Sequence, residues 1–156
     1  MEMGAPGHPG VDQIEAAAAT VQARAAQLAT SMRVFRVGTD PLPDRVDRFA
    51  HVHGGEFIGR TLEKCRHGGN AQPLWIFASV APHRAFCDRC LPAAERALRE
   101  NAELAASLGQ FYVSCDLCAV PEYVGNMKQF AIAHGHILIL GVGCDRCLAV
   151  EVPARG

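Results

Sequence analysis

The chain has 156 residues, of which 49% are hydrophobic and 20% are charged, and its formal net charge is −1. This composition excludes a disordered chain, and the near-neutral charge argues against a dedicated nucleic-acid binder, which needs a basic excess. No apolar run reaches about 18 residues, so no transmembrane helix is expected.

The N-terminal part predicts a tail and then a long helix. Residues 1–10 are rich in Gly and Pro and are expected to form a flexible tail. Asp12 and Glu15 form a capping box ahead of an Ala-rich helix at residues 11–32. Its apolar positions alternate four and three apart, like a coiled-coil seam, which predicts self-association through this helix or packing on the rest of the chain. The seam comprises Ile14, Ala18, Val21, Ala25, Leu28 and Met32.

The segment after this helix carries most of the excess of basic residues. Residues 34–37 continue the helix or begin a strand, so residues 11–37 form the N-terminal helical region. Residues 38–63 predict a linker, where two prolines stop the helix, and a short helix at residues 44–52. Among the basic side chains, Arg45 and Arg48 are candidate partner-binding residues. The segment forms either a nucleic-acid surface or a solvated face of mixed charge.

The cysteines organise the rest of the chain. All seven lie between residues 65 and 147, and six form three C-x-x-C pairs with Asp at the second position. The seventh stands one residue from a histidine. Four clusters of two ligands suffice for two closed tetrahedral sites, so the spacing predicts two structural Zn²⁺ ions. Each Asp is expected to accept backbone N–H bonds within its own turn. The predicted metal ligands are Cys65, His67, Cys87, Cys90, Cys115, Cys118, Cys144 and Cys147.

These clusters can be paired in two ways. In the preferred pairing the two N-terminal clusters form one site and the two C-terminal clusters form the other. The alternative joins the Cys87/Cys90 pair to the Cys115/Cys118 pair across a helix at residues 91–108. Such a helix separates its ends by roughly 25 Å, and a five-residue return strand recovers only about 17 Å, which favours the preferred pairing.

Apolar runs predict strands between the clusters. We expect strands at residues 73–80 and 83–86 before the helix, and at residues 129–133 and 136–142 after it. The buried side of the helix at residues 91–108 is expected to comprise Leu91, Ala94, Leu98, Ala105 and Leu108.

The cysteine-bearing region resembles the zinc-ribbon and treble-clef zinc fingers. The resemblance covers about residues 64–149 and is carried by the sequences CRHG, CDRC, SCDLC and GCDRC. It implies a small metal-stabilised α+β fold with two β-hairpin modules joined by a helix. Residues 64–109 would form the first zinc module with its helix, and residues 110–156 the second zinc ribbon. Because Cys65 and His67 have one residue between them where the family has two or more, His83 is the substitute ligand.

Two further groups of side chains have open roles. Residues 121–128 are expected to form a loop at the tip of the second ribbon, either a recognition tip or an ordinary turn. Its candidate partner-binding residues are Tyr123, Asn126, Met127 and Lys128. His134 and His136 flank Gly135 at a turn and are reserve ligands of the second metal site.

The motifs argue against catalysis. There is no glycine-rich phosphate loop and no nucleophile elbow, and four-ligand sulfur sites leave no open position for a reacting water. We therefore expect a non-enzymatic zinc protein that acts as a protein interaction or adaptor module. The alternatives are a nucleic-acid-associated regulatory zinc-ribbon protein and, after it, a C-x-x-C redox or iron–sulfur protein. The N-terminus lacks a secretory signal pattern, so the expected location is the cytoplasm, with reduced thiols and no membrane association.

Overall fold

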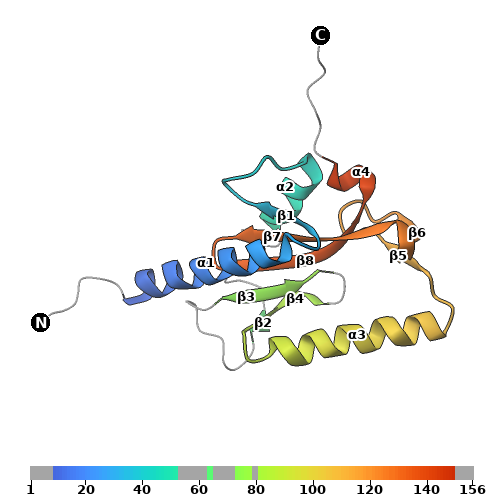
Figure 1. The fold of residues 1–156 in the computed structure, drawn as a ribbon, viewed down its shortest axis with the longest axis horizontal. Helices are drawn as coiled ribbons and strands as arrows, with labels where there is room; N and C mark the ends of the chain where they lie inside the picture. The colour runs from blue at the N-terminus through green and yellow to red at the C-terminus, as the bar shows by residue number, and fades with distance from the viewer. Residues whose placement is uncertain (1–8, 53–62, 65–72, 79–80, 150–156) are drawn as a thin grey trace, which may run out of the picture.

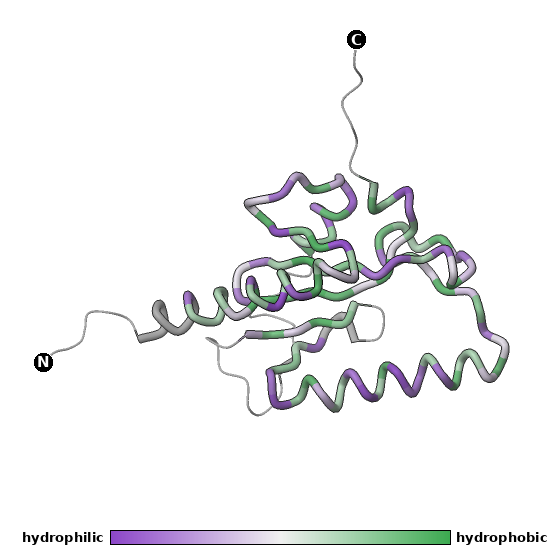
Figure 2. The backbone as a smooth tube through the Cα atoms, in the orientation of Figure 1, coloured by the Kyte–Doolittle hydropathy of each residue, from purple (hydrophilic) through white to green (hydrophobic). Residues whose placement is uncertain are grey.

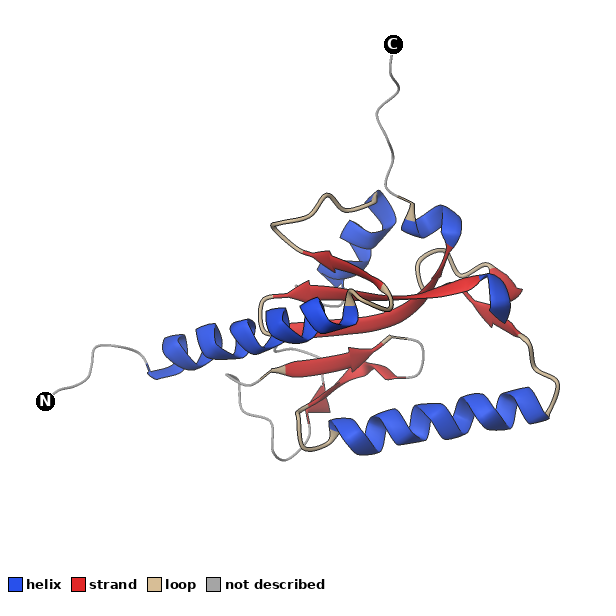
Figure 3. Cartoon of the chain, viewed as in Figure 1, coloured by secondary structure: helices blue, strands red, loops and turns tan. Residues whose placement is uncertain are grey.

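The protein is a small α+β structure with a mixed sheet, a separate two-stranded hairpin and helices on both sides of the sheet (Figures 1 and 3). The computed structural model describes residues 9–52, 63–64, 73–78 and 81–149. The helices are α1 (Pro9–Leu28), α2 (Asp44–Ala50), α3 (Leu91–Ser107) and α4 (Asp145–Leu148), with a 3₁₀ turn, η2, at Val124–Asn126. The strands are β1 (Arg33–Arg36), β2 (Glu63–Lys64), β3 (Leu74–Phe77), β4 (Ala81–Phe86), β5 (Tyr112–Ser114), β6 (Pro121–Tyr123), β7 (Met127–His134) and β8 (Ile137–Cys144).

Six strands form one sheet in the order β1-β7-β8-β3-β4-β2. The β7–β8 and β3–β4 pairs are antiparallel hairpins, whereas β1–β7, β3–β8 and β2–β4 run parallel. The β3–β8 pairing sets Leu74 opposite Ile137 and Phe77 opposite Leu140. It joins strands that the sequence had placed in two separate hairpin modules, so both cysteine-bearing halves contribute to one continuous sheet.

The reason for this continuity is that the central strands are apolar on both faces. All four residues of β3 are buried, and β7 and β8 send alternate side chains to opposite sides. Phe130 and Ile132 lie on one face of β7, and Ala131 and Ala133 lie on the other. A sheet with two apolar faces needs cover on both, which an isolated zinc ribbon lacks.

Helix α1 covers one of these faces. Val21 and Ala25 are fully buried against Ala131, Ala133 and Leu138 of the sheet. Alanine on both surfaces lets the helix approach closely. Of the two alternatives for the N-terminal seam, packing within the chain is therefore the one observed for these positions, and they are not available for self-association.

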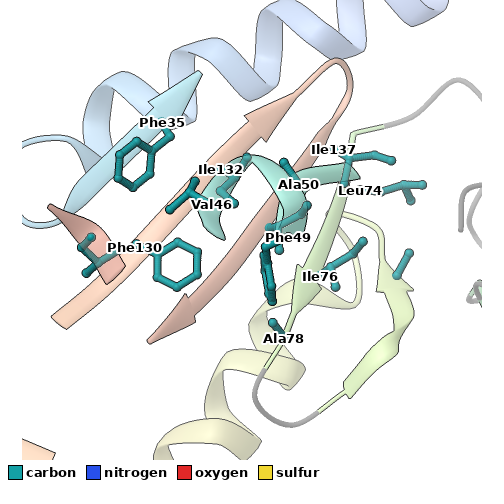
Figure 4. Close-up of a cluster of buried hydrophobic side chains, with 13 residues drawn as sticks. Phe35, Val46, Phe49, Ala50, Leu74, Ile76, Ala78, Phe130, Ile132 and Ile137 are labelled. Atoms are coloured by element: carbon teal, nitrogen blue, oxygen red, sulfur yellow. The ribbon is translucent and has the colours of Figure 1, made fainter. Parts of the chain in front are cut away.

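Helices α2 and α4 cover the opposite face. Val46, Phe49 and Ala50 of α2 pack on Phe130 and the neighbouring aliphatic residues (Figure 4), with the Phe49 and Phe130 rings edge to face at a centroid distance of 5.8 Å. Leu148 of α4 joins the same cluster. The two helices thereby place the N-terminus of α2 beside the C-terminal end of β8, where the last cysteine pair lies.

Helix α3 and the β5–β6 hairpin lie outside the sheet, and we call residues 91–123 the outer arm. Figure 2 shows hydrophobic and hydrophilic residues alternating along α3, which runs beside the body of the protein. No side chain of α3 is buried. Gly109 ends the helix at φ +74°, where glycine carries no steric cost. Leu108, expected on the buried side, is 65% exposed, whereas Leu91 at the other end of α3 packs on a buried cluster of the sheet.

Two smaller differences complete the comparison with the sequence. Residues 121–123, expected in a loop, form β6 and pair with β5, so that Tyr112 stands opposite Tyr123. Of the two alternatives for residues 34–37, the strand is observed: residues 34–36 belong to β1, which pairs with β7. Within the described residues, none of the helices combines the length and hydropathy needed to cross a bilayer.

Candidate metal centre

Four cysteines converge at one end of the β7–β8 hairpin. Cys115 and Cys118 lie in the connection between β5 and β6, Cys144 ends β8, and Cys147 lies in α4. Their four Sγ atoms all lie within 4.8 Å of one another, and Cys118 Sγ is 3.9 Å from Cys144 Sγ. Three of the four residues are buried and Cys118 is half-buried. This group could hold a metal ion.

The donor set and its dimensions fit a tetrahedral ion bound by thiolates. With a Zn–S bond of about 2.3 Å, two sulfurs at tetrahedral positions stand about 3.8 Å apart. The 3.9 Å between the Cys118 and Cys144 sulfurs is close to this value. The residues present therefore match a closed, all-sulfur site.

The first turn of the site is built by local backbone hydrogen bonds. The Cys115 amide donates to the Val120 carbonyl at 3.0 Å, and the Ala119 amide donates to the Cys115 carbonyl at 2.8 Å. Ala119 has φ +64°, the left-handed conformation, which costs a residue with a Cβ about 1 kcal/mol. The turn therefore carries a small strain at the residue immediately after Cys118.

Asp116 fastens this turn to strand β8. Its amide donates to the Val142 carbonyl at 2.9 Å, and its Oδ2 accepts the Val142 amide at 2.7 Å. A Cβ at Gly141 would stand 2.9 Å from the same Oδ2, so a glycine is needed for this approach. In the pair at Cys87, Asp88 accepts the Trp75 indole N–H at 2.9 Å. Both bonds are long-range, whereas the sequence had predicted bonds within the turn.

Backbone amides and one guanidinium donate to the sulfurs. The Leu117 and Cys144 amides donate to Cys115 Sγ at 3.3 and 3.4 Å. The Cys118 and Cys147 amides also donate, to Cys115 and Cys144. Arg45 Nη1 donates to Cys147 Sγ at 3.2 Å from helix α2. A four-thiolate site around a divalent cation carries a net charge of −2, so the guanidinium and the amide dipoles stabilise it.

Without a cation the thiols of Cys115, Cys144 and Cys147 do not ionise together. Burial raises the pKa of Cys147 to about 12 even though Arg45 opposes the shift, and burial also raises the pKa of Cys115. Burial acts in the same direction on Cys144, but hydrogen bonds from Cys147, Cys115 and Cys118 outweigh it and lower the pKa of Cys144 to about 7. Metal binding must therefore expel protons, and the affinity must rise with pH.

Of the four predicted ligands of the first site, the structure describes Cys87 and Cys90. Cys87 is buried at the end of β4, and Cys90 is the half-buried N-cap of α3. Cys65 and His67 lie outside the described residues, so the structure gives no geometry for the first predicted site. His83 lies in β4, but its side chain is not described. Within the described part of the chain, the group at the end of β8 is the only one with metal-site geometry.

His134 and His136 cannot serve as reserve ligands of this group. They flank Gly135 at the turn of the β7–β8 hairpin, whereas Met127 pairs with Cys144 at the opposite end. Strands of eight residues separate these ends by roughly 23 Å. Burial, followed by the proximity of His51, lowers the pKa of His134.

The predicted partner-binding residues have separate surroundings. Tyr123 is half exposed, and its ring stands edge to face with the Tyr112 ring at 6.2 Å. Met127 packs on the cysteines instead of facing a partner. Asn126 lies in η2 and Lys128 near the start of β7, and both are exposed. Arg45 and Arg48 line a shallow cavity of about 150 Å³ with Phe49, Val52 and Leu117.

The sequence did not indicate two interactions that support the site, those of Arg45 and of Asp116. The contact between Arg45 and Cys147 spans 102 positions, and no local pattern signals it. Asp116 was noticed, but its bond to β8 depends on the tertiary structure. Phe111 and Tyr112 are exposed aromatic residues that were not singled out from the sequence, although an aromatic pair three residues before a C-x-x-C turn could have indicated them. Comparisons of the chain with protein-family models, with curated proteins and with solved structures gave no match.

Proposed function

We propose that the chain is a non-enzymatic zinc protein whose metal centre fixes the β5–β6 hairpin as a contact surface for another protein. The observation that carries the proposal is the convergence of Cys115, Cys118, Cys144 and Cys147 within 4.8 Å. Four sulfurs complete a tetrahedron and leave no position for a reacting water, which is the property of a structural site.

The sulfur spacing favours a single ion over an iron–sulfur cluster. A cluster inserts several iron and sulfide atoms between its cysteine ligands, so it needs sulfurs spread farther apart than in this group. None of the six described cysteines is in a disulfide, which suits a reducing compartment. We therefore place the protein in the cytoplasm and assign Zn²⁺ to the site.

A second zinc site is part of the proposal. Cys65, His67, Cys87 and Cys90 would supply its four ligands. The support is the parallel β2–β4 pairing, in which Lys64 stands opposite Ala85. Lys64 immediately precedes Cys65, and Ala85 precedes Cys87 by two residues. The described strands β2 and β4 therefore run side by side in the same direction up to the point in the sequence where each cluster begins.

The contact surface would be the aromatic face of the hairpin. Tyr112 and Tyr123 are cross-strand neighbours on one face of β5–β6 and are 73% and 50% exposed. Phe111 and Val124 add apolar area at the ends of the strands, at 44% and 45% exposed. Exposed tyrosines on a rigid support are typical anchors of protein interfaces.

The test combines metal analysis with partner capture. Native mass spectrometry of the purified chain should show two zinc ions that are lost on acidification. The double substitution Tyr112→Ala/Tyr123→Ala should leave the zinc content unchanged and abolish retention of proteins that the wild-type chain captures. A zinc-free chain, or equal retention by both forms, contradicts the proposal.

One observation supports nucleic-acid binding as the second candidate. Arg45 and Arg48 line the same cavity beside the metal centre, and both lie in the basic segment of the sequence. A phosphate contact there would make binding fall steeply with salt. Titration of labelled DNA and RNA at two salt concentrations tests it, and no binding at low salt rejects this candidate.

A further inference from the structure

Helix α3 has an apolar arc that the rest of the chain covers only in part. Leu91, Ala94, Leu98 and Ala105 are half-buried, and Leu91 packs on a buried cluster of the sheet. A neighbouring stripe remains exposed and comprises Ala93, Ala97, Leu104 and Leu108. The last two are 58% and 65% exposed, although leucine is among the residues most often buried.

The exposed stripe has the spacing of a helix–helix contact. Its members stand four, seven and four residues apart, so they share one side of the helix over about four turns. Glu100 and Asn101 lie at its midpoint. Apart from a salt bridge of 4.0 Å between Arg24 and Glu95, which joins two exposed side chains, the structure shows no ion pair that holds α3 to the body within the described residues.

We propose that this stripe pairs antiparallel with α3 of a second copy of the chain. A two-fold axis between Glu100 and Asn101 sets Ala97 opposite Leu104 of the second copy, and Ala93 opposite Leu108. Each small side chain then meets a large one, which lets two helices interdigitate at a short interaxial distance. The same two contacts recur on the other side of the axis, so the stripe is self-complementary, as an isologous interface requires.

The charges beside the stripe fit the same arrangement. Arg96 and Glu103 lie on one flank of the stripe. Under the two-fold axis, Arg96 comes to a level within one helical turn of Glu103 of the second copy, and the reciprocal pair forms as well. In a parallel pair opposite flanks of the two helices meet, so Arg96 would face the flank of Ala94 and Leu98 of the second copy, where it finds no carboxylate. The pairing of Arg96 with Glu103 therefore favours the antiparallel dimer, in which Glu100 of the two copies also meets across the axis.

The size of the stripe indicates a weak dimer. Two leucines and two alanines per copy offer much less than the ~800 Å² per partner of a standard interface. We expect dissociation in the micromolar range, so that the dimer forms at high protein concentration.

Sedimentation equilibrium of the zinc-loaded full chain tests the proposal with two matched variants, each of which replaces one alanine of α3 by arginine. A97R places a charge in the stripe and should raise the dimer dissociation constant at least about tenfold, as expected for burying an unpaired charge. A106R makes the same change on the opposite, exposed side of α3 and should leave the constant unchanged. Equal effects of the two variants, or a wild-type chain that is monomeric at its highest soluble concentration, overturn the proposal.

A charge swap provides a second, independent measurement. R96E alone should weaken the dimer roughly fivefold because it sets a second carboxylate against Glu103 of the other copy. The double variant R96E/E103R restores opposite charges and should recover most of the affinity, and failure to recover contradicts the antiparallel register. Zinc content and circular dichroism are measured on every variant. A wild-type chain that is monomeric but carries its full zinc content would contradict only the dimer proposal. A wild-type chain that is dimeric but free of zinc would contradict only the proposed metal centre.

Discussion

The sheet and the outer arm are held in place by different interactions. In the sheet, Ile132, Ile137 and Ile139 are fully buried, and helices cover both faces. In the outer arm, Cys115 is the one buried residue, and α3 contributes none. The sheet can rely on hydrophobic burial, whereas the arm has too little core to order itself. A metal at its cysteines would contribute on the order of 10–16 kcal/mol, as much as the whole stability of a typical domain.

Removal of the metal should give the largest difference in stability between the sheet and the outer arm. A strong chelator is expected to abolish the protection of amides in β5 and β6 against hydrogen exchange, because their hairpin has almost no other support. Amides at the centre of β7 and β8 should stay protected. Exchange measured residue by residue distinguishes the regions, and uniform loss of protection, or none, would show that they do not depend on different interactions.

A matched pair of phenylalanine substitutions should show the opposite asymmetry. Phe130→Ala removes a fully buried ring from the sheet and should lower the free energy of unfolding by about 3–5 kcal/mol. Phe111→Ala, in the outer arm, should cost less than about 1 kcal/mol because the ring is already 44% exposed. Urea denaturation of both variants gives the difference, and similar costs would contradict the contrast in burial.

Arg45 contacts the metal centre at which the two regions meet, and its removal should lower the metal affinity. Arg45→Ala deletes the donor to Cys147 and should weaken zinc binding by about 10- to 100-fold, the usual effect of losing an outer-shell partner. Arg48→Ala, on the same helix and beside the same cavity, is the control and should change the affinity little. Competition with a chromophoric chelator measures both, and equal affinities would mean that the Arg45 contact does not stabilise the thiolates.

The smallest expected effect is a gain at the left-handed residue of the turn. Ala119→Gly relieves φ +64° and should stabilise the metal-bound protein by about 1 kcal/mol. Ala102→Gly, in the exposed middle of α3, should instead cost about 1 kcal/mol. Thermal unfolding of the two variants should therefore shift in opposite directions. A loss of stability in both would show that the Ala119 conformation carries no strain.

Local patterns in the sequence predicted most of the individual elements. Apolar runs indicated β7 and β8, and Gly109 indicated the end of α3. The start of the first helix was predicted wrongly, because α1 begins at Pro9 and Asp12, the expected cap, lies inside it. The spacing of the C-x-x-C pairs also indicated which four cysteines come together in the structure. These features depend on residues close in the sequence, where helix and strand periods decide the outcome.

The arrangement of these elements could not be predicted in the same way. The parallel pairing of β3 with β8 depends on which apolar faces meet, and nothing in either strand specifies its neighbour. The apolar arc of α3 indicated a covered side, but the sequence does not show how much of the arc the sheet reaches. The sequence presents Arg45 as a surface charge because its partner, Cys147, lies far along the chain.

The most direct test of the metal centre is the number of zinc ions per chain in the wild type and in the double variant Cys115→Ser/Cys144→Ser. Native mass spectrometry should find one zinc ion fewer in the variant, and exchange in β5 and β6 should be fast in the same sample. The account would be contradicted if both chains carried the same number of zinc ions. It would also be contradicted by a metal-free wild type whose mass is lowered by pairs of hydrogens, which would indicate disulfides.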